Sequence, residues 1–400
     1  MAETPQTLTI GIARELAAHE NRVAVVPVSL AAFAKAGVGA IVEQGAGIAA
    51  GYPDADYRAA KAEIVSDRKA VFAGADIVCQ LHGLGANPTG ARVDLDLVRK
   101  GQVLVGFHEA LAEPKSAQEL AAKGVTILSM ELMPRITRAQ SMDAISSMAT
   151  VAGYKAVLLA AGKLPRMFPM LMTAAGTVAP ARVFVVGAGV AGLQAIATAR
   201  RLGAVVSAYD VRSAVKEQVE SLGAKFVEME LDAGDAEDRG GYAREMGEDF
   251  YRRQREMMLK AVTTADVVIT TAAIPGKKAP VLITEEMVQA TPAGSVIVDL
   301  AAESGGNCAL TKPDETIHVH NTTIIGAMNL ASTVPYHASQ MYSRNIQTFL
   351  LHLLKDGRLN FDSGDEIVAG TLVARDGQIV HPKVKEKLGH STAILSGGGA

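Results

Sequence analysis

Short apolar runs alternate with helical stretches along the first third of the chain. The candidate strands are Leu8–Ala13, Ala40–Glu43, Ala75–Gln80 and Val103–Phe107. The candidate helices between them are Ser29–Ala36, Ser66–Ala73 and Ser116–Ala122. Because strands that alternate with helices pair in parallel, with the helices packed on the faces of the sheet, this pattern predicts an α/β domain.

The same alternation returns in the middle of the chain. There the candidate strands are Ala181–Val186, Val205–Tyr209, Ala265–Thr270, Ser295–Leu300 and Ile324–Gly326. A long helical stretch, about Ala139 to Leu164, would join two domains, and a helical run from Tyr336 to Leu354, without strands of its own, would return to the first. We therefore predict an α/β protein of two Rossmann-like, doubly wound parallel-sheet domains, residues 1–136 with 327–400 and residues 137–326. A cleft between them is expected to hold ligands at the carboxyl ends of the strands.

A glycine pattern follows the first strand of the second domain. The sequence RVFVVGAGVAG places Gly187, Gly189 and Gly192 in the spacing G-x-G-x-x-G, immediately before a helical stretch. The first glycine permits a tight turn, the second lets the backbone approach a pyrophosphate, and the third lets the helix pack close to the sheet. A pyrophosphate would face unpaired N–H groups at the positive end of the helix dipole. The pattern therefore predicts dinucleotide binding.

An acidic residue indicates which dinucleotide is preferred. Asp210 ends the next apolar run, 18 residues after Gly192, where a carboxylate accepts hydrogen bonds from the adenosine ribose hydroxyls. The same carboxylate would repel the 2′-phosphate of NADP, so NAD(H) is favoured, and the nearby Arg212 weakens this preference slightly. Val190 and Val211 complete the predicted contacts to the cofactor.

Composition and charge narrow the class of protein. The 400 residues carry a net charge of −3 with a pI of about 6.3, which implies no strong attraction to nucleic acid or anionic membranes. Cys79 and Cys308 form no disulfide framework or metal cluster, and no metal site is expected. The first residues lack a signal-peptide pattern. The most apolar helical stretch, Ala144–Leu164, contains Ser, Tyr and Lys residues and is expected to be too polar to span a bilayer, so we expect a soluble, cytoplasmic protein.

Polar side chains gather just before the long helix. They are Arg135, Gln140, Asp143 and Ser146. A loop with these residue types suits the clamping of a carboxamide or a ribose. The same stretch also fits an ordinary helix N-terminus, with Ser141 as the cap and Asp143 favouring the helix dipole. Both interpretations stay open at this point.

One long stretch is not typical of regular structure. Leu231–Glu248 reads LDAGDAEDRGGYAREMGE, with Tyr242 after a pair of glycines. A surface loop of this length in a compact domain is commonly a lid, a binding loop or a variable insertion. Residues on this loop are therefore candidates for contact with a ligand, and equally for a solvated insertion.

Polar residues also follow several candidate strands. Glu303 and Asn307 come after the run SVIVDL, and we expect them to face the cleft. His82 and His108 each come after a strand of the first domain. A histidine at such a position either faces a ligand or satisfies a structural hydrogen bond, and the pattern does not choose between the two.

Long strings of the sequence resemble one family. These strings include MELMPRITRAQSMDAISS, FPMLMTAAGTVAPARVFVVGAGVAGLQAIATARRLGA, GGYAREMGEDF, AAIPGKKAPVLITEEMV and VIVDLAAESGGNC. They resemble the NAD(H)-binding domain of proton-translocating nicotinamide nucleotide transhydrogenase, and the resemblance extends over about residues 7 to 385. Because the sequence ends without membrane helices, it is similar to the separate soluble α1 subunit of bacterial systems that are split into three polypeptides.

The resemblance implies roles for these residues. Arg135, Gln140, Asp143 and Ser146 would contact the dihydronicotinamide and its ribose, and Tyr242 would lie at the tip of a closing loop. The chain would bind NAD(H) and transfer hydride from NADH to NADP⁺ on a partner subunit, while membrane subunits couple the transfer to proton translocation. The enzyme would be Re/Si-specific, active only with its partner subunits, and homodimeric in this chain. It would lie on the cytoplasmic face of the inner membrane through those partners, without inserting directly.

Alanine dehydrogenase is the alternative, because it shares this fold and many motifs. Its site uses an arginine that matches Arg22 or Arg14 and a histidine that matches His108. Its lysine position, which would hold a substrate carboxylate, reads Gln80, and its aspartate position reads Glu303. This departure disfavours amino-acid oxidation and leaves the role of the first domain open. A regulatory NAD-binding module without catalytic activity is a further alternative.

Overall fold

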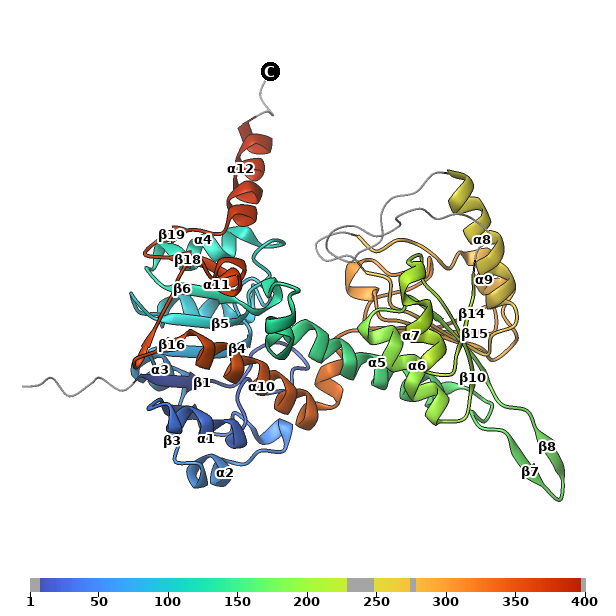
Figure 1. Ribbon diagram of the computed structural model, residues 1–400, viewed down its shortest axis with the longest axis horizontal. Coiled ribbons are helices and arrows are strands. Elements are labelled where there is room, and N and C mark those ends of the chain that lie inside the picture. The colour runs from blue at the N-terminus through green and yellow to red at the C-terminus, as the bar shows by residue number, and fades with distance from the viewer. Residues whose placement is uncertain (1–7, 229–247, 274–277, 397–400) are drawn as a thin grey trace, which may run out of the picture. The chain divides into compact units, whose positions relative to one another are not determined.

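The protein is described by a computed structural model that covers residues 8–228, 248–273 and 278–396. The chain divides into two compact units, Met1–Met148 with Ser332–Ala400, and Ala149–Ala331. Each unit is built on one large sheet of mainly parallel strands flanked by helices (Figure 1). The α/β, Rossmann-like fold class is therefore confirmed. Tyr242 and nearly all of its predicted loop lie outside the described residues.

The sheet of the first unit has eight strands in the order β19-β18-β6-β5-β4-β1-β2-β3. The strands are β1 (Thr9–Ile12), β2 (Gly39–Glu43), β3 (Glu63–Val65), β4 (Ile77–His82), β5 (Val103–Phe107), β6 (Thr126–Ser129), β18 (Leu372–Arg375) and β19 (Gln378–Ile379). The first six run parallel, whereas β18 pairs antiparallel with both β6 and β19. The residues of β4 are almost all buried, as expected for a strand covered on both faces.

The C-terminal segment contributes both helices and strands to the first unit. The helices of this unit are α1 (Pro27–Lys35), α2 (Asp54–Ala59), α3 (Arg68–Gly74), α4 (Pro114–Ala122), α10 (Pro335–Leu353), α11 (Glu366–Thr371) and α12 (Pro382–Ser396). The expectation that the returning segment lacks strands is wrong, because β18 and β19 extend the sheet beyond β6. These strands are too short, at four and two residues, to show a clear alternation in sequence.

The second unit follows the nucleotide-binding strand order. Its seven strands are ordered β11-β10-β9-β12-β13-β15-β14, and all pairs are parallel except that of the edge strand β14. The strands are β9 (Arg182–Val186), β10 (Val205–Tyr209), β11 (Lys225–Phe226), β12 (Val267–Thr270), β13 (Val296–Asp299), β14 (Thr316–Val319) and β15 (Thr322–Gly326). Numbered along the chain, the parallel strands have the Rossmann order 3-2-1-4-5-6, in which ligands bind beyond the carboxyl end of the first strand.

Helices and short elements complete the two units. The remaining helices are α5 (Ala144–Lys163), α6 (Val190–Arg201), α7 (Lys216–Ser221), α8 (Glu248–Val262) and α9 (Glu285–Gln289). The 3₁₀ turns are η1 (Ile48–Ala50), η2 (Gly90–Asp96), η3 (Met130–Leu132), η4 (Thr137–Met142), η5 (Ser213–Val215), η6 (Ala302–Ser304) and η7 (Leu330–Thr333). Two small hairpins pair β7 (Leu171–Thr173) with β8 (Gly176–Val178) and β16 (Leu354–Lys355) with β17 (Arg358–Leu359).

Helix α5 is long and apolar enough to cross a membrane by length and composition alone. Its mean hydropathy reaches 1.4, so the expectation that its polar residues exclude this is wrong. Ala156, Val157 and Ala160 are fully buried in the core of the second unit, among the side chains of β9 and α6. This burial accounts for the apolar character of the helix, as in the core helices of other α/β folds.

Two glycines of α5 make a stability test with opposite signs. A Cβ on Gly153 would lie 2.1 Å from the carbonyl oxygen of Ala191 in the first turn of α6, whereas a Cβ on Gly162 would meet no atom within 4 Å. We expect Gly153→Ala to lower the free energy of unfolding by about 1–3 kcal/mol through overpacking. Gly162→Ala should instead raise it by roughly 0.5–1 kcal/mol, since alanine restricts the unfolded chain. Urea unfolding of both variants measures the difference, and equal shifts would contradict the close packing of α5 on α6.

Candidate nucleotide site and strand-end clusters

The glycine turn after β9 is closed by its own packing. Gly187 has a φ of +95°, which favours glycine, and a Cβ there would lie 2.6 Å from Thr271 Oγ1. The Thr271 hydroxyl donates a 3.0 Å hydrogen bond to the carbonyl of Gly187. A Cβ on Gly192 would lie 1.8 Å from the same carbonyl. The first and third glycines of the pattern are thus required by contacts within the protein.

Gly189 differs from its two neighbours in the pattern. A Cβ built on it meets no atom within 4 Å, so the protein itself leaves this side of the turn open. Gly189 is the N-cap residue of α6, and no side chain caps that helix. The first N–H groups of α6 therefore point toward open space, as the binding of a pyrophosphate requires.

Asp210 lies beside the turn at the end of β10. Its carboxylate accepts a 2.7 Å hydrogen bond from the N–H of Ala188, between the first two glycines. Arg212 donates to it three times, from the backbone N–H, from Nε and from Nη2, each at 2.9 Å. A carboxylate has about four acceptor positions, so Arg212 occupies those that a ribose would use. Of the other predicted contacts, Val190 is exposed and Val211 is half-buried.

The segment before α5 combines structural and exposed residues. Arg135 and Gln140 are exposed, whereas Asp143 and Ser146 are half-buried. Asp143 accepts a 2.9 Å hydrogen bond from the N–H of Ser146 and a 2.5 Å bond from its hydroxyl. Asp143 is therefore the cap of α5, and the expectation of Ser141 as the cap of a helix from about Ala139 is wrong.

The strand-end residues Glu303 and Asn307 have different surroundings in the second unit. Glu303 is exposed, and its carboxylate accepts the N–H of Asn329 at 2.9 Å. Asn307 is fully buried and donates to the carbonyls of Ala272 and Pro280, both at 2.8 Å. The expectation that Asn307 faces a ligand is therefore wrong, because its amide holds together the loops that follow β12 and β13.

In the first unit, Arg22 is neutralised by a carboxylate of its own chain. It is 4% exposed, and Nε and Nη2 donate to the two oxygens of Glu20 at 2.8 and 2.6 Å. His82 Nε2 lies 2.8 Å from the same carboxylate. Burial raises the pKa of Glu20, but the hydrogen bonds from Arg22 and His82 outweigh it and hold the pKa well below its ordinary value. Arg14, in contrast, is largely exposed and lies 3.6 Å from Glu43.

Gln80 belongs to a second neutralised cluster. Its side-chain amide donates to Asp94 at 2.8 Å, and Arg68 forks onto the same carboxylate at 2.5 and 2.7 Å. Arg68 thus brings a cation to the place where the lysine of the alternative family is missing, and Asp94 pairs with it. Sequence reasoning missed Arg68, because it starts α3 and reaches Gln80 only through the fold.

His108 and Glu131 form a buried titratable pair of groups. Among the described residues, neither ring nitrogen of His108 has a hydrogen-bond partner, and burial lowers the pKa of His108 to about 4. Glu131 accepts the N–H groups of His108 and Ala110, both at 3.1 Å. Burial, with a contribution from Glu109, raises the pKa of Glu131 to about 7. Both groups are held neutral by their surroundings.

These two groups give pH dependences of opposite sign. Glu131 binds a proton in the folded state up to a pKa of about 7 against 4.5 in the unfolded chain, so its stabilising contribution is lost as pH rises through this window. His108 loses stability as pH falls from 6.5 toward 4. We expect Glu131→Gln to become more stable relative to wild type as pH rises from 4.5 to 7, by on the order of 3 kcal/mol.

Urea unfolding at pH 4.5, 5.5 and 7 measures this trend. Glu119→Gln is the matched control, since Glu119 is an exposed carboxylate of the same unit. A difference between Glu131→Gln and wild type that stays constant with pH would contradict the raised pKa.

Among the described residues, no group of His, Cys, Asp and Glu side chains is arranged to hold a metal ion. The two cysteines are buried and free, and burial raises the pKa of the Cys79 thiol to about 12. The chemistry that these residues offer is therefore binding and orientation of a nucleotide at Gly189 and Asp210.

Comparison with known proteins gives the family. The alanine dehydrogenase/PNT N-terminal domain matches residues 11–152, and the alanine dehydrogenase/PNT C-terminal domain matches residues 156–382. The first section of the NAD(P) transhydrogenase alpha subunit of Rhodospirillum rubrum, a separate polypeptide, is 48% identical over 381 residues, covering 94% of this chain and 98% of that one. The structure of a transhydrogenase from Sinorhizobium meliloti has a TM-score of 0.83 and 40% identity, covering 93% of this chain and all of that one.

An L-alanine dehydrogenase structure is similar in fold, with a TM-score of 0.78, 24% identity and coverage of 96% of this chain and 99% of that one. The higher identity on the transhydrogenase side agrees with the motifs that carried the resemblance. The chain belongs to the alanine dehydrogenase/PNT family, on the side of the NAD(P) transhydrogenase alpha subunits.

Proposed function

We propose that this chain is the NAD(H)-binding subunit of a proton-translocating transhydrogenase. NADH bound at the turn after β9 gives hydride to NADP⁺ held on a partner subunit, and membrane subunits couple the transfer to proton movement. The open face of Gly189, at an uncapped helix N-terminus beside Asp210, is the observation that carries the proposal. The similarity to a relative named as one section of an alpha subunit supports partner subunits. On this proposal the chain lies on the cytoplasmic face of the inner membrane through its partners.

The exposed residues before α5 are the proposed nicotinamide contacts. Arg135 and Gln140 would clamp the dihydronicotinamide carboxamide and ribose, together with Asp143 and Ser146. Tyr242 is proposed to close over the nucleotide, and Glu303 to face it at the carboxyl end of β13. Hydride transfer between two nicotinamides needs no obligatory base, since no proton moves with the hydride. The protein needs only to orient the two rings and exclude water.

Amino-acid oxidation is the weaker candidate for this chain. An amino-acid substrate would need a free cation to hold its carboxylate. In the first unit, Arg22 forks onto Glu20 and Arg68 forks onto Asp94, while Gln80 stands at the lysine position. The carboxylates of the protein itself thus occupy the guanidinium groups that a substrate would need. This arrangement favours transfer between nucleotides.

A mixing experiment tests the proposed function. The purified chain, an NADP-binding transhydrogenase subunit, NADH and an NADP⁺ analogue are combined, and the reduced analogue is followed by its absorbance. We expect hydride transfer in the mixture and very little with either protein alone. Oxidation of L-alanine with NAD⁺ by the chain alone would instead support the alternative. NADH binding without either reaction would support a regulatory module.

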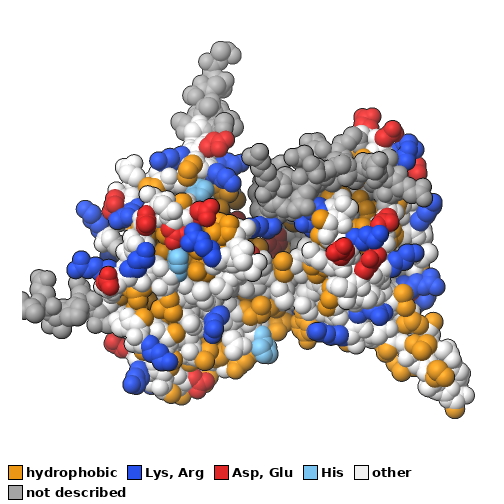
Figure 2. Space-filling model, viewed as in Figure 1, with side chains coloured by type: hydrophobic (Ala, Val, Ile, Leu, Met, Phe, Trp, Pro, Cys, Tyr) orange, Lys and Arg blue, Asp and Glu red, His pale blue; other side chains and the backbone are white. Residues whose placement is uncertain are grey.

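A homodimer is included in the proposal, and the hairpin β7–β8 supports it. The hairpin projects from the second unit (Figure 1), and Figure 2 shows hydrophobic side chains along it. Met170 and Met172 are 56% and 77% exposed, and exposed apolar patches on a projecting element commonly mark contacts between chains. A second copy of the chain would cover these methionines.

A single substitution tests the hairpin contact. We expect Met172→Asp to shift the chain from dimer to monomer, because a charge in an apolar interface is costly to desolvate. Sedimentation equilibrium measures the change as a dissociation constant raised at least about 100-fold. Val93→Asp is the control, since Val93 is 53% exposed in the first unit and should leave the dimer intact. An unchanged dissociation constant in Met172→Asp would place the interface elsewhere.

A further inference from the structure

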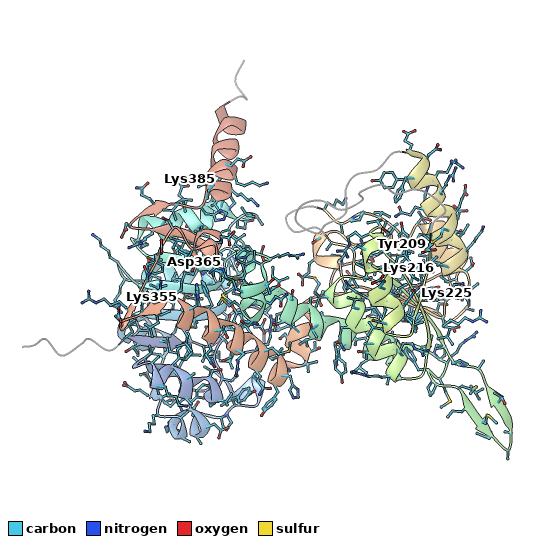
Figure 3. The ribbon with its side chains drawn as sticks, viewed as in Figure 1. Tyr209, Lys216, Lys225, Lys355, Asp365 and Lys385 are labelled. Carbon is cyan, nitrogen blue, oxygen red and sulfur yellow. The ribbon has the colours of Figure 1, made fainter. Side chains whose placement is uncertain are left out.

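The C-terminal segment of the first unit contacts the turn η4, which lies between Arg135 and Asp143. Arg138 in this turn donates from Nη2 to Asp365 Oδ1 at 2.7 Å. Asp365 (labelled in Figure 3) is the N-cap residue of α11 and accepts the N–H of Ile367 at 3.0 Å. His352, near the end of α10, lies 2.5 Å from its other oxygen. Asp365 is thus held in place by two other groups while it binds Arg138.

A second contact holds the same turn from α10. Asn345 is 5% exposed, and its side-chain amide donates to the carbonyl of Ser141 at 2.9 Å. Ala139 and Met142 of the turn are also buried. The turn is therefore fixed at Arg138 and at Ser141, on either side of Gln140 and just before Asp143.

We propose that Asp365 and Asn345 are positioning residues for hydride transfer. The inference rests on the proposed function, because it concerns the placement of the proposed nicotinamide contacts. Neither side chain is assigned a contact with the nucleotide. Each fixes one end of the turn from which Gln140 projects and to which Arg135 and Asp143 are joined. The rate of a transfer between two held rings depends steeply on their geometry, and a displacement of about 1 Å can cost on the order of 100-fold.

The exposure of the ion pair separates positioning from stability. The side chains of Arg138 and Asp365 are 49% and 18% exposed, and ion pairs of this kind contribute little to the free energy of unfolding. Burial raises the pKa of Asp365, but the N–H of Ile367, His352 and Arg138 outweigh it and lower the pKa overall. The carboxylate is therefore charged at neutral pH. A substitution that removes only the charge should alter the turn without unfolding the unit.

Asp365→Asn is the sharpest variant for this test. Asparagine keeps an oxygen to cap α11, but it loses the charge that binds Arg138. We expect kcat for hydride transfer in the mixed system to fall about 10-fold, with KM for NADH changed less than about 2-fold. Hydrogen exchange of the amides of residues 137–143 should become faster, with no change in the sheet. The double variant Arg138→Ala, Asp365→Asn should be no slower than the single variants, since both remove the same contact.

Matched variants complete the design. Arg92 and Glu119 form an exposed ion pair of 2.8 Å in the same unit, and Arg92→Ala should leave kcat and exchange in residues 137–143 unchanged. Asn345→Ala tests the second anchor and should reproduce the slow transfer and the faster exchange. Thermal unfolding of each variant shows whether the unit has remained folded.

The outcomes separate this inference from the proposed function. Unchanged exchange in Asp365→Asn and in Asn345→Ala overturns the inference, whatever the activity. Faster exchange with wild-type kcat also overturns it, because the contacts would then be structural only. If the wild-type chain transfers no hydride, the proposed function fails, and with it the catalytic side of the inference. Faster exchange in that case still shows that these residues anchor the turn.

Discussion

Asp143→Asn should slow hydride transfer by roughly 10–100-fold while it changes NADH affinity by less than about 3-fold. Asp143 caps α5 and lies among the proposed nicotinamide contacts. Asparagine is as good a helix cap as aspartate, so the helix should remain stable. The carboxylate charge is lost, and charged groups placed beside a reacting centre commonly contribute this much to the rate. Single-turnover transfer in the mixed system and calorimetric titration with NADH separate the two effects.

Thr137→Ala is the control for this experiment, because Thr137 is an exposed polar residue of the same turn. It should leave both the rate and the affinity unchanged. If Asp143→Asn weakens NADH binding as much as it slows transfer, the residue is a binding contact without a role in the transition state.

Asp210 and Arg212 should change nucleotide preference in opposite directions. We expect Asp210→Asn to weaken NADH binding by about 10–100-fold, since hydrogen bonds to a charged acceptor are worth about 1.5–3 kcal/mol. The preference for NADH over NADPH should shrink as well, because the charge that repels a 2′-phosphate is removed. Arg212→Ala should enlarge that preference, because it frees the carboxylate oxygens that Arg212 now occupies. Calorimetry with NADH and NADPH on both variants measures the four affinities.

Lys216→Ala gives a matched control for the loss of a cation in the same unit. Lys216 is paired with Glu228, away from the carboxylate of Asp210. Equal affinity of the wild-type chain for NADH and NADPH would remove the basis of this prediction. A shift in the same direction in Asp210→Asn and Arg212→Ala would show that the two residues do not compete for the ribose.

The elements of the fold that were predictable are those where one local pattern has one physical outcome. The apolar runs that became β9, β10, β12 and β13 are buried on both faces, so they stand out against their polar surroundings. Gly187 needs a positive φ and Gly192 a close contact, and these requirements are visible as spacing. The short strands β18 and β19 carry no such signal, because pairing with β6 stabilises them more than their own sequence does.

The candidate site was only partly predictable, for a related reason. Ser141 and Asp143 are both good cap residues, and the choice between them depends on where α5 starts, which packing decides. Asn307 follows a strand like a ligand-facing residue, yet the two loops close over it. Arg68 reaches Gln80 through the shared partner Asp94. Each of these outcomes depends on contacts between segments that are distant in sequence.

The return of the chain to its first unit has a consequence for synthesis on the ribosome. Residues 149–331 are continuous, so the second unit emerges complete and is able to fold as soon as its last strand is released. The first unit lacks α10 and its two edge strands until the final segment is made. Until then β6 is an unpaired, buried-type edge, which is a site for wrong pairing. Nascent chains stalled before residue 372 should therefore depend on chaperones more than the finished protein does.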